Sequence, residues 1–433
     1  MQQKAGLTLQ RVLVLSYQSR VTETAAGLRV GPVSAHMSRY VPFMVAPREV
    51  YDITNEQAAL HTHAVFGFLE KEVGHIEALM STLVYSFWRY VEGNWEVICN
   101  DIEHGSLSTD LPAPNKQLES ISRLFKPQPE RANELRQLFA AGFDGISLRI
   151  WPELRFVRTL TTGGFALHAQ LLSNYYMKGV KLLSLAHVAS EGFIGFNISD
   201  NPDEQIYTAM PDYAFLEFIA LSNTGLDQPK TQFLEELKLG GEYEVVMTTP
   251  MGLHRYRTGD IIKVVGFQEQ TPIYEFQYRL GQILNIYWEK TDEAAIFESV
   301  SRALERLPRK DRVRLVDYTT TEDICMPRLA SKRDGTQKHY YLFIEVEGAN
   351  GEEIIMTDHE KAMFDGTLCE VSEPYSLIRQ SESAAAMEVV QVKPGTFIQM
   401  KSTLILWTQN QQYKCPRVMR RPEFLKLLMD ASC

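Results

Sequence analysis

The chain is 433 residues long, with 45% hydrophobic and 23% charged residues and a net charge of −10 at pH 7. This composition is typical of globular proteins, and the length exceeds one ordinary core, so we expect at least two domains. The largest basic cluster (Arg417, Arg420 and Arg421) is too short for a nucleic-acid stripe. The acidic balance therefore argues against nucleic acid and anionic membrane surfaces as partners.

The five cysteines indicate a reducing compartment. They are widely spaced and form no CxxC pair, so we expect free thiols. The first twenty residues lack the pattern of a signal peptide, and no run of eighteen apolar residues could span a bilayer. We therefore expect a cytoplasmic protein without membrane insertion.

The first part of the chain is predicted to be helical after an initial strand. We expect strand and loop over Met1–Ala46, with VLVLSY as a buried strand. Apolar residues recur at helical spacing in Thr54–Trp95, which predicts two helices. The proline-rich stretch Leu111–Arg131 is expected to hold one short helix at most.

From Gly145 onward, short branched and aromatic runs bounded by turn residues predict a sheet-rich middle. A helix is expected at Asp292–Leu307, followed by the strands RVRLVDYTTT and HYYLFIEVEG. A second helix at His359–Val371 and a last strand near Leu404 complete a small α+β sandwich.

The domain boundary is placed in the segment Gly281–Lys290, between the last middle strand and the helix that follows. This divides the chain into residues 1–284 and 285–433. The fold class expected is therefore α/β, with a large N-terminal α/β domain and a small C-terminal α+β domain.

The segment LHRYRTGD (Leu253–Asp260) lies between two strand-like runs and is predicted to be a tight loop. Gly259 permits a backbone conformation that other residues resist. The carboxylate of Asp260 would then be free to accept hydrogen bonds from a vicinal diol, such as that of a ribose. The alternative is a hairpin aspartate that satisfies its own turn amides.

Two further segments could carry chemistry. In AHVASEGFIGFN, a strand runs into small residues, and Glu191 could hold a hard cation such as Mg²⁺. The alternative is a turn with an exposed glutamate. In QQYKCPR, Lys414 and Arg417 are two cations in a proline-restrained loop, and the lysine could meet a phosphate. An exposed lysine without a ligand is the alternative there.

Several other sites are disfavoured by the pattern. His61 and His63 are two residues apart and do not share a helical face, which argues against metal chelation. The aromatic residues of VYSFWRYVEGNW fit a core better than a stacking site. The chain contains no GxSxG, no GxxxxGK[ST] and no GxGxxG.

The order and flanks of these segments resemble the auxin-responsive Gretchen Hagen family of acyl-acid amido synthetases, and look closest to its animal members. The resemblance is carried by FLEFIAL followed by GGEYEVVMTTPMGLHRYRTGDIIKVVGF. The runs GISLRIWPELRFVRTLTTGG, EKTDEAAIFESV, PGTF and QYKCPR are similar to other motifs of the family. The similarity covers most of the chain from Thr54 onward.

The resemblance implies a luciferase-like, adenylate-forming fold and an ATP-dependent acid–amino acid ligase that uses Mg²⁺. A carboxylic acid would attack the α-phosphorus of ATP, and an amino acid would then displace AMP to form an amide. Phosphate charge would be neutralised by the metal and a lysine, and the C-terminal domain would swing between the steps. The expected partners are a small carboxylic acid and an amino acid, and the protein is expected to be a monomer.

The resemblance also implies roles for particular residues. Asp260 would hold the ribose hydroxyls, Lys414 would be the mobile cation of catalysis, and Glu191 would lie near Mg²⁺. The remaining nucleotide-binding residues implied in this way are His187, Val188, Ala189, Ser190, Tyr256 and Arg257.

The chain departs from the family pattern in three places. The family's Ser/Thr/Gly-rich phosphate loop is not found upstream of Tyr51, so we expect an N-terminally incomplete nucleotide half. His187 and His254 stand where many members carry tyrosine, although an imidazole could still stack on adenine. The hinge RLGQILNIYWEK lacks the usual acidic residues before Lys290. A fragment, a shortened isoform and an inactive, nucleotide-binding pseudoenzyme therefore stay open as alternatives.

Overall fold

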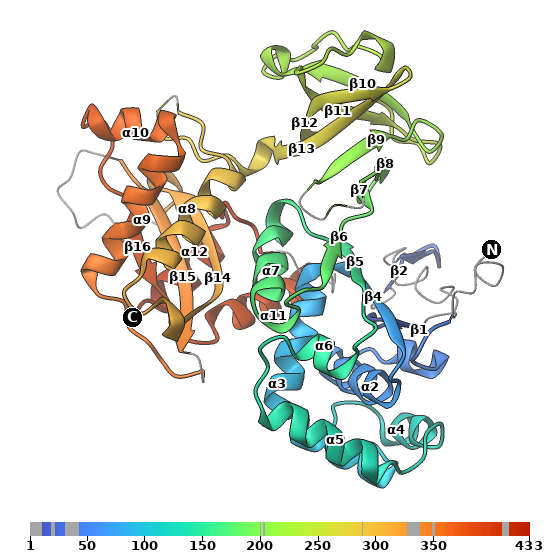
Figure 1. Ribbon diagram of the computed structural model, residues 1–433. Coiled ribbons are helices and arrows are strands. Elements are labelled where there is room, and N and C mark those ends of the chain that lie inside the picture. The colour runs from blue at the N-terminus through green and yellow to red at the C-terminus, as the bar shows by residue number, and fades with distance from the viewer. Residues whose placement is uncertain are drawn as a thin grey trace. The chain divides into compact units, whose positions relative to one another are not determined.

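A computed structural model describes residues 11–18, 22–30, 43–199, 201, 204–287, 289–326, 338–348, 351–408 and 415–433. The chain divides into two compact units, which are Met1–Ala186 with Asn197–Gln205, and His187–Phe196 with Ile206–Cys433. Both units combine helices and strands (Figure 1), which confirms the expected α/β class. No helix within the described ranges is long and apolar enough to cross a membrane.

The first unit is built on a parallel sheet with the strand order β1-β4-β5-β6. The strands span Arg11–Val14 (β1), Val73–Met80 (β4), Phe156–Leu160 (β5) and Lys181–Leu183 (β6). Its helices are α2 (Glu56–Leu69), α3 (Ser81–His104), α4 (Asn115–Ser122), α5 (Pro129–Ala140), α6 (Ile146–Ile150) and α7 (Ala166–Leu171). A short ribbon pairs β2 (Thr22–Glu23) with β3 (Arg29–Val30). The core includes Phe68, Trp88 and Trp151 in mutual ring contact.

Strand β4 corrects the prediction of two adjoining helices over Thr54–Trp95. Helices α2 and α3 are present, but Val73–Met80 between them is a strand. Its buried residues Gly74, Ile76 and Ala78 alternate as in a strand, and the segment pairs with both β1 and β5. Sequence periodicity alone does not separate a short buried strand from a helix.

The second unit begins with an antiparallel sheet in the order β10-β11-β12-β13-β9-β8-β7. Its strands are β7 (Ala186–Ala189), β8 (Gly192–Asn197), β9 (Ile206–Ala209), β10 (Phe215–Ala220), β11 (Glu242–Thr248), β12 (Tyr256–Gln268) and β13 (Thr271–Arg279). Figure 1 shows these strands together in green and yellow. The sheet-rich middle is therefore confirmed.

The chain continues into a smaller sheet in the order β14-β15-β16, with β14 and β15 antiparallel and β15 and β16 parallel. Its elements are α8 (Glu293–Arg306), β14 (Val313–Glu322), β15 (Tyr340–Gly348), α9 (Asp358–Val371), α10 (Glu373–Gln380), β16 (Glu388–Gln391), α11 (Thr396–Thr408) and α12 (Pro422–Asp430). Asp292 caps α8 by accepting the N–H of Ala295, so the helix begins where expected. The segment near Leu404 was predicted to be a strand and lies in helix α11 instead.

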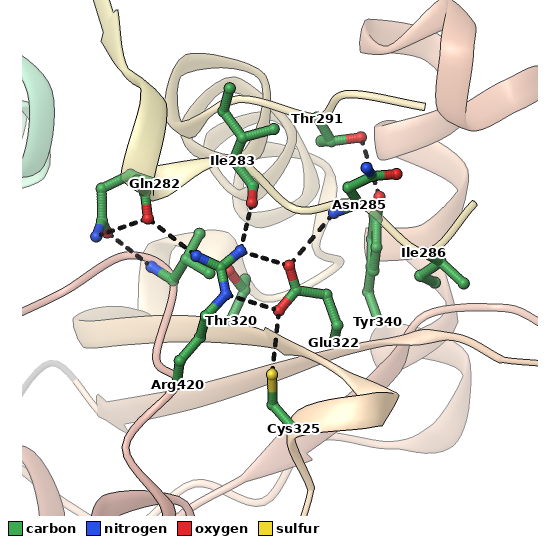
Figure 2. Close-up of polar contacts among 12 residues, drawn as sticks. Gln282, Ile283, Asn285, Ile286, Thr291, Thr320, Glu322, Cys325, Tyr340 and Arg420 are labelled. Carbon is green, nitrogen blue, oxygen red and sulfur yellow. Dashed lines mark hydrogen bonds and ion pairs between the residues drawn. The ribbon is translucent and has the colours of Figure 1, made fainter. Parts of the chain in front are cut away.

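The linker after β13 is fastened to the small sheet by Arg420 and Glu322, which we call the linker clasp. Arg420 donates to the carbonyl oxygens of Gly281 (3.0 Å) and Ile283 (2.6 Å) and pairs with Glu322. Glu322, buried at the end of β14, also accepts the N–H of Asn285 at 3.3 Å. Figure 2 shows these contacts meeting around the guanidinium group. The predicted boundary at residues 284 and 285 falls in this linker.

Candidate functional site

A β-bulge in strand β12 places Asp260 inside the antiparallel sheet. Three residues of β12, Thr258–Asp260, lie opposite the single residue Val245 of β11. Gly259 takes a left-handed φ of 74°, which a side chain would disfavour. The Thr258 hydroxyl donates to Val245 O (2.8 Å) and accepts the N–H of Asp260 (3.1 Å). The bulge thus turns the aspartate toward the sheet interior.

This arrangement differs from the tight loop predicted over Leu253–Asp260. The turn between the strands covers Thr249–Arg255, and β12 already begins at Tyr256. The Thr-Gly-Asp sequence is typical of turns, and here it forms the bulge instead. The glycine has the predicted conformational role, but it acts within a strand.

Both carboxylate oxygens of Asp260 are engaged. Arg279 donates from Nε to Oδ1 at 2.6 Å and from Nη2 to Oδ2 at 3.0 Å. His187 Nε2 lies 3.3 Å from Oδ2. Burial alone would raise the pKa of Asp260, but the hydrogen bonds from His187 and Arg279, together with the charge of Arg279, outweigh it and lower the pKa to about 2. Asp260 is therefore an ionised carboxylate.

The prediction of a free carboxylate at Asp260 is consequently wrong. Its side chain is only 3% exposed, and the three hydrogen bonds occupy most of the roughly four acceptor positions of a carboxylate. Arg279 is 47% exposed, so its guanidinium presents the pair to solvent. A diol at this place would meet Arg279 and Asp260 together.

Glu191 and Tyr256 lie beside this pair. Glu191 is half-buried in the turn between β7 and β8, next to the exposed Ser190. The Tyr256 hydroxyl lies close enough to Glu191 to interact with its carboxylate, and this interaction raises the pKa of Tyr256. The charges of Glu191 and Asp260 both act on Arg279 and contribute to raising its pKa. The structure thus brings together Glu191, Tyr256 and Asp260, which are separated in the sequence.

His187 is a buried core residue, not an open stacking surface. Its side chain is 8% exposed, and Nδ1 lies 3.2 Å from the Tyr274 hydroxyl. The rings of Tyr207, Tyr274 and Phe276 surround it at centroid distances of 5.3 to 5.9 Å. The expectation that this imidazole stacks on adenine is therefore wrong for the geometry seen here. Val188 and Ala189 continue the strand and are half-buried.

Arg257 anchors the strand below the turn. Its Nε lies 3.0 and 3.1 Å from the two oxygens of the buried Glu244, and its Nη2 donates to Thr224 O at 2.7 Å. These bonds use most of the guanidinium donors within the protein. Arg257 therefore shapes the local backbone and is poorly placed to serve as a nucleotide ligand.

Lys414 lies outside the described residues. Upstream, Glu345 accepts the N–H groups of Gly395 (2.7 Å) and Phe397 (2.9 Å) where α11 begins. Downstream, Arg417 is 2% exposed and contacts Asp317 at 2.5 Å. Of the two cations noted in this stretch, Arg417 is therefore buried and paired within the protein.

The residues at this site could supply some of the ligands of a nucleotide-bound Mg²⁺, and the nucleotide and water would supply the rest. Among the described residues, no three His, Cys, Asp or Glu side chains come together as a metal site. Mg²⁺ commonly takes one or two carboxylates and completes its shell with phosphate and water oxygens. The half-buried Glu191 fits that pattern as a single carboxylate ligand. The exposed guanidinium of Arg279 beside Tyr256 fits the ribose or phosphate oxygens of a nucleotide.

Sequence reasoning missed Arg279 and Tyr274. Arg279 is the register partner of Asp260, and Tyr274 closes the other side of His187. One argument could have pointed to Arg279: a buried, ionised aspartate needs a cationic partner. The sequence does not indicate which of the chain's arginines supplies it until the strand register is known.

The fold and the site together define a structural class, and comparison with known proteins then identifies the family. The class is a mixed α/β protein with a parallel sheet, a central antiparallel sheet that carries a carboxylate–guanidinium site, and a smaller sheet after a linker. Three family models match the chain in this order. They are the GH3 family N-terminal domain at residues 1–182, the central domain at residues 207–279 and the C-terminal domain at residues 297–423.

Known relatives agree with these models. A probable indole-3-acetic acid-amido synthetase GH3.9 of Oryza sativa subsp. japonica is 30% identical over 387 residues, which cover 86% of this chain and 84% of that protein. The indole-3-acetic acid-amido synthetase GH3.8 of Oryza sativa subsp. indica is 29% identical, covering 98% of this chain and 71% of that protein. The chain belongs to the GH3 family, which confirms the resemblance stated above.

Further comparisons support the family and its fold. The 4-substituted benzoates-glutamate ligase GH3.12 of Arabidopsis thaliana is 30% identical over 88% of this chain and 66% of that protein. The solved structure of the GH3.15 acyl acid amido synthetase matches with a TM-score of 0.85 at 25% identity, covering 98% of this chain and 75% of that chain.

Proposed function

We propose that this protein is an ATP-dependent acid–amino acid ligase that joins a small carboxylic acid to an amino acid through an acyl-adenylate. The names of its relatives describe amido synthetases of an acid and an acid–glutamate ligase. The observation that carries the proposal is the meeting of Glu191, Tyr256 and the Asp260–Arg279 pair on one sheet. This arrangement offers a metal ligand and nucleotide-binding groups side by side.

In the first step, a carboxylate oxygen of the acid attacks the α-phosphorus of ATP, and the bond to the pyrophosphate oxygen breaks. The role of Arg279 is to bind nucleotide oxygens, those of the ribose included, while Asp260 holds the guanidinium in place. Ser190, exposed beside Glu191, lies beside the phosphates in this proposal. Mg²⁺ would neutralise phosphate charge when bound, with Glu191 as its carboxylate ligand.

In the second step, the amine of an amino acid attacks the acyl carbon. The bond between that carbon and the AMP oxygen breaks, AMP leaves with the electron pair, and the amine proton passes to solvent or a base. Lys414 is proposed as the cation that neutralises the nucleotide phosphate during adenylation.

The five cysteines bear on the compartment. All of them (Cys99, Cys325, Cys369, Cys415 and Cys433) are free thiols. Free thiols are typical of a reducing compartment, so we propose a cytoplasmic location, which fractionation of cells with an antibody to the protein would test. The monomeric state stays a prediction for sedimentation analysis.

The experiment that tests the ligase is pyrophosphate release with ATP, Mg²⁺ and a panel of carboxylic acids. Release is expected with at least one acid, and addition of amino acids should yield an amide and AMP by mass spectrometry. At a Mg²⁺ concentration that half-saturates the wild type, Glu191→Gln should lose most of the release, whereas Glu305→Gln, at an exposed position of α8, is the matched control.

Two outcomes would count against the proposal in different ways. ATP binding without pyrophosphate release from any acid would indicate the alternative, a nucleotide-binding pseudoenzyme. A wild-type protein that binds neither ATP nor AMP would remove the nucleotide from the site altogether.

A further inference from the structure

His187 makes a hydrogen bond with each of its ring nitrogens, and the two partners determine where its proton lies. Nε2 faces Oδ2 of Asp260 at 3.3 Å, and Nδ1 faces the Tyr274 hydroxyl at 3.2 Å. An ionised carboxylate only accepts, so Nε2 must carry a proton, and an imidazole with a single ring proton holds it there. Nδ1 is then the acceptor, and the Tyr274 hydroxyl must donate to it.

Tyr274 suits the donor role. Its side chain is fully buried, and burial raises the pKa of Tyr274 far above its ordinary value, so the hydroxyl keeps its proton. Strand β8 leaves room for this hydroxyl at Gly195, where an added Cβ would lie 2.2 Å from the oxygen. The backbone of β8 therefore approaches Tyr274 closely enough to fix the position of its oxygen.

The bonds form a continuous series from the sheet interior to its surface. Tyr274 donates to His187, His187 donates to Asp260, and Asp260 accepts two hydrogen bonds from the half-exposed Arg279. Removing the imidazole would leave Oδ2 of Asp260 bonded to Arg279, and the carboxylate could then turn with the guanidinium. The buried residues of the series thus determine the position of the exposed guanidinium of Arg279.

We propose that His187 is a positioning residue for nucleotide binding, which holds Asp260 and thereby Arg279 through a fixed Nε2–H tautomer oriented by Tyr274. The histidine takes no part in contacts with the base. The part of this inference that concerns nucleotide binding rests on the proposed function, whereas the part that concerns the tautomer does not. The neighbouring titratable groups are Asp260, Tyr274 and Tyr207, with Arg279 beyond the carboxylate.

The first experiment measures the tautomer in the wild-type protein and needs no nucleotide. Nitrogen-15 NMR of histidine-labelled protein at neutral pH should show a protonated Nε2 and an unprotonated Nδ1 for His187, assigned by its loss in His187→Gln. A Tyr274→Phe variant should free Nδ1 and move its chemical shift. An Nε2 without a proton at neutral pH would overturn the inference.

The second experiment compares AMP binding by calorimetry in two variants. His187→Gln keeps an amide donor at about the distance of Nε2 and should bind within about threefold of wild type. His187→Phe keeps the ring but no donor and should bind about tenfold more weakly, because loss of a hydrogen bond to a charged group has about that effect. His187→Asn, whose shorter amide does not reach Asp260, replaces the phenylalanine variant if that variant does not fold. The exposed His359→Gln is the control.

The outcomes separate the two claims. If His187→Phe or its replacement binds AMP as tightly as wild type, His187 does not position the site. If wild type itself binds no AMP or ATP, the proposed function fails, and the tautomer measurement still decides whether the Tyr274–His187–Asp260 series exists.

Discussion

Arg279 is the register partner of Asp260 across strands β12 and β13, and its guanidinium closes on the carboxylate with two hydrogen bonds of 2.6 and 3.0 Å. Arg279 is also the last residue of β13, immediately before the linker. A buried carboxylate positioned by a bulge thus meets a cation at the end of the neighbouring strand. Two residues later along the chain, the carbonyl oxygen of Gly281 accepts a hydrogen bond from Arg420 of the linker clasp.

The first prediction concerns Asp260→Ala. The variant removes the acceptor that holds Arg279, so the affinity for AMP should fall about tenfold or more. The free energy of unfolding should fall by about 2 kcal/mol, which is less than for a fully buried pair because Arg279 is half-exposed. Calorimetry with AMP and urea unfolding measure the two effects.

Asp212→Ala is the control for this change, because Asp212 is an exposed aspartate in the same unit. Its affinity should equal that of wild type. Unchanged AMP affinity in Asp260→Ala would remove Asp260 from the nucleotide site.

The second prediction concerns Gly195→Ala. The added Cβ would lie 2.2 Å from the Tyr274 hydroxyl and 2.8 Å from the backbone oxygen of Thr208, and the latter cannot move without disturbing β9. We expect the free energy of unfolding to fall by about 2 kcal/mol, as in other overpacked cores. Gly366→Ala is the matched control, since its Cβ meets nothing within 4 Å in helix α9 and should stabilise by up to about 1 kcal/mol.

A third prediction follows from His63, which is buried in the first unit with Nε2 2.6 Å from Ser16 O. Burial lowers the pKa of His63 to about 4, against an ordinary 6.5, and the bond to Ser16 opposes this only in part. Between these values the unfolded chain binds a proton and the folded one does not. The free energy of unfolding should therefore fall as the pH drops from 6.5 toward 4, by about 3 kcal/mol in all.

Urea unfolding of wild type and His63→Gln between pH 5 and 7.5 would measure this dependence. His75, whose pKa burial also lowers to about 4, contributes with the same sign. The difference between wild type and variant isolates His63. Parallel pH profiles for the two proteins would contradict the assignment.

Much of the fold could be predicted because local signals agreed with it. The ranges predicted for α8 and α9 lie within a residue of their observed ends. Strand β4 and helix α11 were mistaken, and both are short apolar segments whose conformation depends on their tertiary neighbours. A strand paired on both sides is recognised only when its partners are known.

The candidate site was predictable in its residue types but not in its contacts. Glu191, Tyr256 and Asp260 do come together, as the resemblance implied. The pairing of Asp260 with Arg279 depends on strand register, and its orientation depends on the bulge at Gly259. Neither property is encoded in a short motif, because each arises from which strand lies beside which.

The fourth prediction concerns the linker clasp. Arg420→Gln removes the donors to the carbonyl oxygens of Gly281 and Ile283 and the charge opposite Glu322. The amide of Asn285, which donates to Glu322, should then exchange its hydrogen about tenfold faster, because local opening needs less free energy. Hydrogen exchange by mass spectrometry over the linker measures the effect. Arg306→Gln, which breaks an exposed pair with Glu370, should leave the linker unchanged.

The last prediction separates Glu191 as a metal ligand from Glu191 as a partner of Tyr256. Glu191→Gln keeps the size of the side chain and a hydrogen-bond acceptor for the Tyr256 hydroxyl, but removes the charge that Mg²⁺ prefers. The Mg²⁺ concentration that gives half-maximal pyrophosphate release should rise about tenfold. Tyr256→Phe removes the hydroxyl and leaves the carboxylate, so its Mg²⁺ requirement should not rise. If the two variants showed equal increases, the effect would come from the lost Glu191–Tyr256 interaction, and Glu191 would have no role as a metal ligand.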